Sequence, residues 1–367
     1  MVFGAWAAAW PLIRADLHLT YVQVGLLLSL PQLFGNVVEP AVGVLGDAWD
    51  RRALIRSGGV VFAAAVLGIA LSHAFAPLLV ALALVNPASG AFVSLSQAVL
   101  MDLDPRGHEL NMARWALAGS VGVVAGPLLL GAVVGAGLGW RGAFIACAVV
   151  AVLLLALVWR AGVATPPSGV RRSLGRALRQ GTRDAFRALG RPDVLRWLTL
   201  LEFINLMLDI LLDFLALYLV DIVGLSGARA GFAIAVWTGV GLLGDAALIP
   251  LLKRMDGLRY LRASALAVLF LFPAFLLVDD VPSKVVLLGA LGLLDSGWYA
   301  ILQGRLYSAM PGRSAAVMTL GNLFGLAGGL LPLALGVIAE RYGLGAAMWL
   351  LMAAPIALLV GLPARSR

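Results

Sequence analysis

The sequence predicts an all-α polytopic membrane protein, and two observations carry most of that prediction. Of the 367 residues, 62% are hydrophobic and only 13% are charged, whereas a soluble domain has about 25% charged residues. The hydrophobic residues are gathered into long runs, and a helix needs about 20 such residues to cross a bilayer. A soluble globular domain does not fit this combination.

Eleven of these runs predict membrane-spanning helices. A further apolar stretch, residues 1–13, is too short to span and lacks the basic start of a signal peptide. We interpret it as the second half of a truncated first helix, which would begin before Met1. The predicted spans cover residues 20–45, 53–75, 77–101, 113–137, 141–161, 195–223, 229–252, 258–278, 283–307, 314–339 and 344–363.

The distribution of basic residues is the third observation, and it orients the chain. If the spans alternate from a cytoplasmic N-terminus, all but five of the 27 Lys and Arg residues fall in segments on the cytoplasmic side. Such an excess is expected of cytoplasmic segments. The sequence therefore predicts that both termini are cytoplasmic, and the net charge of +8 requires no nucleic-acid partner. The five on the opposite side are Arg14, Arg141, Arg229, Lys284 and Arg341.

The residues that usually carry enzyme chemistry are sparse. Cys147 is the only cysteine, and the three histidines (His18, His73 and His108) are far apart in the sequence. We therefore expect no disulfide, no metal site and no cofactor. The sequence also shows no phosphate-binding loop and no nucleophile–base pair, so an enzyme is not predicted.

A polar segment divides the chain into three parts: residues 1–161, 162–193 and 194–367. Within the middle part, leucines and alanines fall on one helical face and arginines on the other. This pattern predicts a basic amphipathic helix on the membrane surface, and a solvated linker helix is the alternative.

The first and third parts resemble each other at a constant shift of 206 residues. This relationship suggests two parallel six-helix repeats, which is an arrangement found in rocking transporters. The shift matches Gly25 with Gly231, Gly35 with Gly241, Gln97 with Gln303, Pro105 with Pro311, and Glu39 with Asp245.

Two motifs resemble those of the major facilitator superfamily. Residues 43–55, GVLGDAWDRRALI, are similar to its signature between helices 2 and 3, although Ala48 and Asp50 depart from a basic residue and a glycine. Residues 118–135 are similar to the helix-5 signature of its drug–proton antiporter branch. The matching positions are Gly43, Asp47, Arg51 and Arg52 in the first motif, and Gly122, Gly126, Pro127 and Gly131 in the second.

This resemblance implies two six-helix bundles with pseudo-two-fold symmetry, and it is closest to bacterial efflux carriers such as the fosmidomycin-resistance type. It also implies a monomer in a bacterial plasma (inner) membrane and a cytoplasmic gate made by the first motif. The alternative for Asp47 is a charge that only marks the membrane boundary. The helix-4 arginine of proton-coupled relatives is absent, and Asn86–Pro87 interrupts that span instead.

Acidic residues inside the spans point to a cation site. In "LEFINLMLDILLDF", residues 201–214, a straight helix would place Glu202, Asp209 and Asp213 on one narrow face, with Asn205 beside them. A charge at the bilayer centre costs about 2.5–3.5 kcal/mol on insertion scales, so we expect these acids to face a watery cavity. Hydrogen bonding to neighbouring helices is the alternative. The other intramembrane acids are Glu39, Asp245 and Asp295.

No Lys or Arg is expected deep in a span, so the site would suit protons, Na⁺ or an organic cation. Aromatic and amide side chains inside the spans are further cavity candidates, because aromatic rings can stack on a cationic substrate. Core or lipid-facing positions are the alternative for the aromatic residues. The candidates are Trp237, Trp298, Tyr299, Gln97 and Gln303.

The sequence and the resemblance together predict a secondary transporter that works by alternating access. The expected reaction is proton-coupled efflux of a small lipophilic or cationic molecule through the membrane. Uptake of a cationic nutrient and flipping of a lysolipid are alternatives on the same fold. A non-transporting membrane sensor and a membrane-embedded enzyme are alternatives from other classes.

Overall fold

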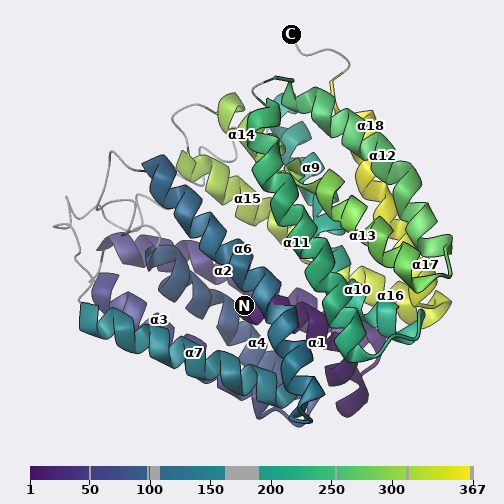
Figure 1. The fold of residues 1–367 in the computed structure, drawn as a ribbon. Coiled ribbons are helices and arrows are strands. Elements are labelled where there is room, and N and C mark those ends of the chain that lie inside the picture. The colour runs from purple at the N-terminus through teal and green to yellow at the C-terminus, as the bar shows by residue number, and fades with distance from the viewer. Residues whose placement is uncertain are drawn as a thin grey trace.

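The computed structural model forms two helical bundles (Figure 1). It describes residues 1–48, 51–96, 99, 108–161, 190–252, 254–310 and 314–363, and these residues contain no strand. The helices up to α7 make one bundle, coloured purple to blue-green, and the helices from α9 onward make the other, coloured green to yellow. The all-α prediction is therefore confirmed.

In the first bundle, α3 packs against both α4 and α7, α2 packs against α4, and α1 packs against α6. The π-helical segment η1 follows α4 directly. The elements are α1 (Val2–Asp16), α2 (Tyr21–Ala48), α3 (Arg51–Ala70), α4 (Phe75–Ser89), η1 (Gly90–Ser94), α6 (His108–Gly135) and α7 (Gly139–Ala161).

In the second bundle, α11 packs against α13, and α12 packs against α13 and α18. Its elements are α9 (Pro192–Asn205), η2 (Leu206–Ile210), α10 (Leu211–Asp221), α11 (Gly227–Leu252), α12 (Gly257–Leu277), α13 (Val281–Asp295), α14 (Trp298–Ala309), α15 (Ser314–Gly328), α16 (Leu331–Tyr342), α17 (Leu344–Trp349), η3 (Leu350–Met352) and α18 (Ala353–Gly361).

Within the described residues, ten helical stretches are long and apolar enough to cross a membrane. The predicted span 113–137 falls on α6 and is not among these ten stretches. Its apolar part is the shorter helical segment Val121–Gly135. Large apolar side chains cover the outside of the bundles. On α7, for example, Val149, Val152, Leu153 and Leu157 are exposed. A soluble monomer rarely exposes such a continuous apolar surface, so these side chains are suited to lipid.

Five predicted spans contain an interruption of the α-helix, including η1 in 77–101 and η3 in 344–363, and all five still qualify as membrane spans by length and hydropathy. The span 195–223 contains the π turn η2, and the span 283–307 breaks at Ser296–Gly297. Gly297 has a φ of 76°, which favours glycine. The span 314–339 breaks between α15 and α16, where Pro332 occupies the first turn of α16. The middle segment 162–189 lies outside the described residues.

The internal repeat is visible in the contacts between helices. A methyl group added at Gly35 would lie 3.0 Å from Asn86 Cβ, and one added at Gly241 would lie 3.3 Å from the Gly292 carbonyl oxygen. The same shift of 206 residues that relates the two glycines also relates their two neighbours. The repeat therefore preserves a helix–helix contact, as expected for bundles with pseudo-two-fold symmetry.

A second pair of contacts follows the same shift and joins the two bundles. Gly25 on α2 faces the backbone of Pro332 and Leu333 on α16, and Gly231 on α11 faces the Pro127 carbonyl on α6. Residues 127 and 333 are again 206 apart. The bundles thus meet along two corresponding seams, α2 with α16 and α6 with α11.

Candidate functional site

A pocket with a volume of about 340 Å³ lies between the two bundles. The first bundle supplies most of its lining, and η2 and α10 of the second bundle supply the rest. Most of the lining is apolar. The lining residues are Val2, Phe3, Trp6, Leu27, Leu28, Pro31, Gln32, Ile69, Leu82, Val85, Asn86, Asp209, Leu212 and Asp213.

The charged residues of this pocket all belong to the second bundle. Asp209 is exposed and Asp213 is half-buried, and both belong to the second bundle, whereas Gln32 and Asn86 are the polar residues on the opposite wall. No Lys or Arg is among the lining residues. Trp6 adds an aromatic surface that is held edge-on by Trp10, with ring centroids 4.3 Å apart. Apolar walls with two carboxylates suit a lipophilic cation.

Glu202 precedes the π turn η2, Asp209 lies within it, and Asp213 follows it in α10. A π turn holds more residues than an α turn, so the helix after it is rotated relative to a straight continuation. Glu202 packs against Gly328 of α15, where it leaves no room for a methyl group, and its Oε2 is buried without a hydrogen-bond partner. Glu202 is therefore not among the residues that line the pocket, and the prediction that the three acids share one narrow face stays a prediction. Asn205, which precedes the π turn, is half-buried and is not among the lining residues.

The remaining predicted acids lie on other helices. Glu39 packs against the start of η1, where a methyl group on Gly90 would be 3.3 Å from Glu39 Cγ. Asp245 accepts a hydrogen bond from the Gly297 N–H at 3.2 Å. Asp295 is 5% exposed, and its Oδ2 has no hydrogen-bond partner. The structure thus brings two of the six acids into the described pocket.

The predicted cavity aromatics lie elsewhere. Trp237 is buried against Gly292, and Trp298 is fully buried, with its indole N–H donating to Ser264 Oγ at 2.8 Å. Tyr299 is exposed, and Gln303 is half-buried. None of these four residues lines the described pocket. Gln97 lies outside the described residues.

The predicted gate motif spans the end of α2 and the start of α3. Gly43 and Asp47 belong to α2 (Tyr21–Ala48), but their side chains lie outside the described part of the structure. Arg51 and Arg52 begin α3, and both interact with other residues. The role of this motif as a cytoplasmic gate stays a prediction.

The predicted helix-5 motif lies on α6 at a junction of three helices. A methyl group at Gly122 would collide with Met1, just before α1, and one at Gly126 would collide with Met1 and the backbone of α1. On its other side, the motif faces α11. A methyl group added at Gly131 would lie 3.9 Å from the Ala228 carbonyl oxygen, and the Pro127 carbonyl faces Gly231. Small residues allow such close approach of helices, so the motif lets α6 contact both α1 and a helix of the second bundle.

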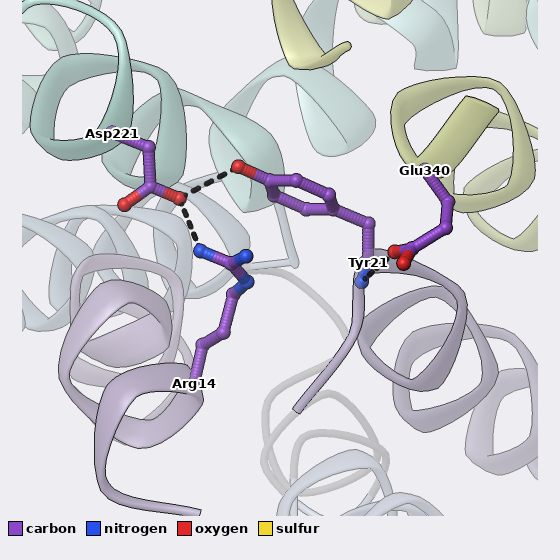
Figure 2. Close-up of polar contacts among 4 residues, drawn as sticks. All are labelled: Arg14, Tyr21, Asp221 and Glu340. Atoms are coloured by element: carbon purple, nitrogen blue, oxygen red, sulfur yellow. Dashed lines mark hydrogen bonds and ion pairs between the residues drawn. The ribbon is translucent and has the colours of Figure 1, made fainter. Parts of the chain in front are cut away.

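A polar cluster that sequence reasoning missed joins the two bundles at one end (Figure 2). Arg14 Nη1 lies 2.7 Å from Asp221 Oδ2, and the Tyr21 hydroxyl donates to the same oxygen at 2.9 Å. The Tyr21 N–H donates to Glu340 Oε2 at 2.8 Å. The Arg14 guanidinium also lies 4.0 Å from the centre of the Tyr21 ring. We call these four residues the bundle clasp.

The bundle clasp connects α1 and α2 of the first bundle to α10 and α16 of the second. Arg14 and Asp221 are partly exposed, with 29% and 22% of their side-chain surface accessible. A single exposed ion pair contributes about 0.2–1 kcal/mol. Several contacts that break together can still shift a balance between two conformations, because an energy of about 1.4 kcal/mol changes an equilibrium tenfold.

Replacing Asp221 with asparagine is expected to open this end more often. The substitution removes the ion pair with Arg14 and weakens the bond to Tyr21. We expect a membrane-impermeant maleimide, added from the clasp side, to modify a cysteine at Gln32 about three to five times faster, given an exposed-pair energy of about 1 kcal/mol. The measurement uses a Cys147→Ser background.

Asp16→Asn is the matched control for this prediction. Asp16 pairs with Arg141 at the same end, but both residues belong to the first bundle. This substitution should leave the modification rate unchanged. An equal rise in both variants would contradict a specific role for the bundle clasp.

Comparison with known proteins identifies relatives that match different shares of the chain. A model of the Major Facilitator Superfamily matches residues 1–331. The fosmidomycin resistance protein of Escherichia coli (strain K12) is 27% identical over 154 residues, which are 42% of this chain and 38% of that protein. A Pseudomonas aeruginosa protein described as transcription regulatory protein OpdE is 27% identical over 310 residues, which are 78% of this chain and 71% of that protein. The match to the first relative thus spans well under two thirds of its length.

Solved structures with the same fold are also found. The nucleoside transporter NupG has a TM-score of 0.78 at 14% identity, and the match covers 98% of this chain and 94% of that chain. A bacterial homologue of the human lysosomal transporter Spinster, inward-facing and unoccupied, has a TM-score of 0.72 at 18% identity, over 98% and 91% of the two chains. Because these identities are low, the likeness shows the fold alone. The family model covers most of the sequence, and the two-bundle fold agrees with it, so this chain belongs to the Major Facilitator Superfamily.

Proposed function

We propose that this membrane transporter exports a small lipophilic cation in exchange for protons, by alternating access of the pocket between its bundles. One observation carries the proposal. The pocket places Asp209 and Asp213 of the second bundle opposite an apolar and aromatic wall of the first. A substrate held there contacts both bundles, so its binding can be coupled to their relative movement.

The carboxylates of Asp209 and Asp213 also explain how a cation is exchanged for protons. A bound organic cation and a bound proton each neutralise negative charge in the pocket, so the two compete for the same site. A site that always holds one or the other moves a substrate in one direction and protons in the opposite direction. The likeness to a protein described as a fosmidomycin resistance protein favours outward movement, because a transporter that confers resistance removes its substrate from the cell.

The orientation is part of the same proposal. We place the protein in a bacterial plasma (inner) membrane as a monomer, with both termini in the cytoplasm, because the basic segments are expected on that side. The bundle clasp then lies at the extracellular end, and the motif that contains Asp47, Arg51 and Arg52 forms the cytoplasmic gate. Protons are the proposed coupling ion.

Transport by purified protein in liposomes tests the proposal, with ethidium as the cationic probe. An inside-acidic pH gradient should drive ethidium into the vesicles and should release protons from them at the same time. Fluorescein, a flat anion, is the matched probe and should not be moved. Ethidium uptake equal to that of protein-free liposomes, or equal uptake of both probes, would reject the proposal.

A further inference from the structure

The break between α13 and α14 leaves backbone groups unpaired inside a membrane-spanning segment. The segment Val281–Leu306 qualifies as one span by length and hydropathy. Ser296 is extended there, with φ −54° and ψ 138°, and Gly297 follows with a φ of 76°. The last carbonyl groups of α13 therefore lack helical partners, and the Tyr260 hydroxyl reaches three carbonyl groups at the break.

The Tyr260 hydroxyl lies in a cluster of oxygen atoms at this break. It is 3.4 Å from the Leu293 carbonyl oxygen, 3.2 Å from that of Leu294, 3.0 Å from that of Ser296 and 3.4 Å from Ser296 Oγ. A hydroxyl has one proton to donate, so it cannot satisfy all of these acceptors at once. Ser296 Oγ donates to the Leu293 carbonyl at 2.7 Å. Several carbonyl lone pairs remain available.

Two carboxylates lie at the same break. Asp295 is the last residue of α13, is 5% exposed, and has an Oδ2 without a hydrogen-bond partner. The Asp245 side chain is occupied on one oxygen by the Gly297 N–H. The indole nitrogen of Trp237, on the neighbouring helix, is also buried without a partner that meets hydrogen-bond geometry.

The local charge is negative without a basic counterpart. The C-terminus of a helix carries partial negative charge, and Asp295 adds a carboxylate there. Among the described residues, no Lys or Arg forms an ion pair with Asp245 or Asp295. Lys284 is buried on the same helix, but it lies in the first turn and donates to the Phe275 carbonyl at 2.7 Å.

We propose that this break binds one Na⁺ ion. The donors are Asp295 Oδ2, the free oxygen of Asp245, and the carbonyl oxygens at the end of α13. Oxygen donors suit hard cations, and half-helix C-termini with unwound carbonyls hold Na⁺ in membrane transporters of other architecture.

This site is separate from the substrate pocket. Neither Asp245 nor Asp295 is among the residues that line that pocket. The ion would join α11, α13 and α14 within the second bundle, so its binding does not require a transported substrate. The Na⁺ site can therefore be tested without assuming the proposed function.

The test measures Na⁺ binding to the full chain purified in detergent. Thermal unfolding is followed in NaCl and in choline chloride at equal ionic strength, and binding of ²²Na⁺ is measured directly. For a site occupied at 100 times its Kd, we expect Na⁺ to raise the Tm by about 3–4 °C. Asp295→Asn should abolish both the Tm shift and ²²Na⁺ binding, whereas Asp279→Asn, at an exposed acid near the opposite end of α13, should preserve them.

Asp245→Asn provides a second measurement in case Asp295→Asn does not fold. It removes the negative charge of a proposed donor but keeps an oxygen that can accept from the Gly297 N–H, and we expect about tenfold weaker ²²Na⁺ binding, which corresponds to about 1.4 kcal/mol. Equal Tm values in NaCl and choline chloride would overturn the proposal. A Na⁺-induced Tm shift that persists in Asp295→Asn would also overturn it. Neither result bears on ethidium–proton exchange, which is measured separately.

Discussion

Replacing Asp209 and Asp213 together with asparagine is expected to abolish the exchange of ethidium for protons. Asparagine keeps the shape of the side chain but can neither carry a negative charge nor take up a proton. The two aspartates are the charged residues of the pocket lining, so the double variant loses both the attraction for a cation and the proton carrier. We expect the initial rate of pH-driven ethidium uptake in liposomes to fall at least about tenfold, which corresponds to a loss of about 1.4 kcal/mol.

The single variants should differ from the double variant in degree. Each leaves one carboxylate in the pocket, so some affinity for ethidium should remain while the ratio of protons to substrate changes. Folding should be preserved in all three variants, because removing an intramembrane charge lowers the cost of burial. Size-exclusion elution and Tm measure this directly.

Glu202→Gln is the matched control on the same helix. Glu202 precedes the π turn and packs against Gly328, and it is not among the residues that line the pocket. We expect this variant to retain most of the uptake rate. If Glu202→Gln abolishes exchange and the aspartate variants do not, the assignment of the substrate site to the described pocket is wrong.

The arrangement of helices was accessible from the sequence because hydropathy and glycine spacing encode it. A span must be apolar over a fixed length, so the runs of hydrophobic residues mark the helices. Gly25 and Gly231 occupy corresponding seams, and a close backbone contact of this kind favours a small residue. The shift of 206 residues therefore reports a real spatial relationship.

The π turn was not predicted, because it has no clear sequence mark. The segment Leu206–Ile210 reads LMLDI and contains neither glycine nor proline. Straight-helix geometry therefore omitted the change in helix rotation that the π turn introduces between Glu202 and Asp213. The break at Ser296–Gly297, by contrast, carries a turn-favouring Ser-Gly pair, and attention to that pair would have indicated it.

The bundle clasp was not predictable from one sequence for another reason. Arg14 and Asp221 are 207 residues apart, and each stands at a helix end where a charged residue is ordinary. Their pairing depends on how the two bundles meet, which local sequence patterns do not specify. Arg14 offered one weak signal, because it is one of five basic residues outside the predicted cytoplasmic segments.

Replacing Gly25 with alanine is expected to impair transport strongly, by separating α2 from α16. The added methyl group would lie 2.7 Å from the Pro332 carbonyl oxygen and 2.9 Å from Leu333 Cα. Both are backbone atoms, so the clash can be relieved only by moving a helix. Overpacking of this kind typically costs about 1–3 kcal/mol, and we expect ethidium uptake to fall about tenfold or more.

Gly231→Ala is the matched control, because the internal repeat places it at the corresponding seam. Its added methyl group would lie 3.4 Å from the Pro127 carbonyl oxygen, which is ordinary contact. The uptake rate of this variant should stay within about twofold of the unmodified protein, since an energy below about 0.5 kcal/mol is expected where no clash forms. An equal loss in the two alanine variants would show that the two seams are under the same steric constraint, contrary to the structure.

The direction of the Gly25→Ala effect can also be tested. The seam of α2 with α16 includes the Leu333 N–H bonded to Ser29 Oγ at 2.9 Å, and it ends at Tyr21 and Glu340 of the bundle clasp. Forcing the helices apart here should weaken the clasp, so maleimide should modify a cysteine at Gln32 faster from that side, as in Asp221→Asn. Because both changes act on one interface, their effects should be less than additive in the double variant. Fully additive effects would mean that the seam and the bundle clasp open independently.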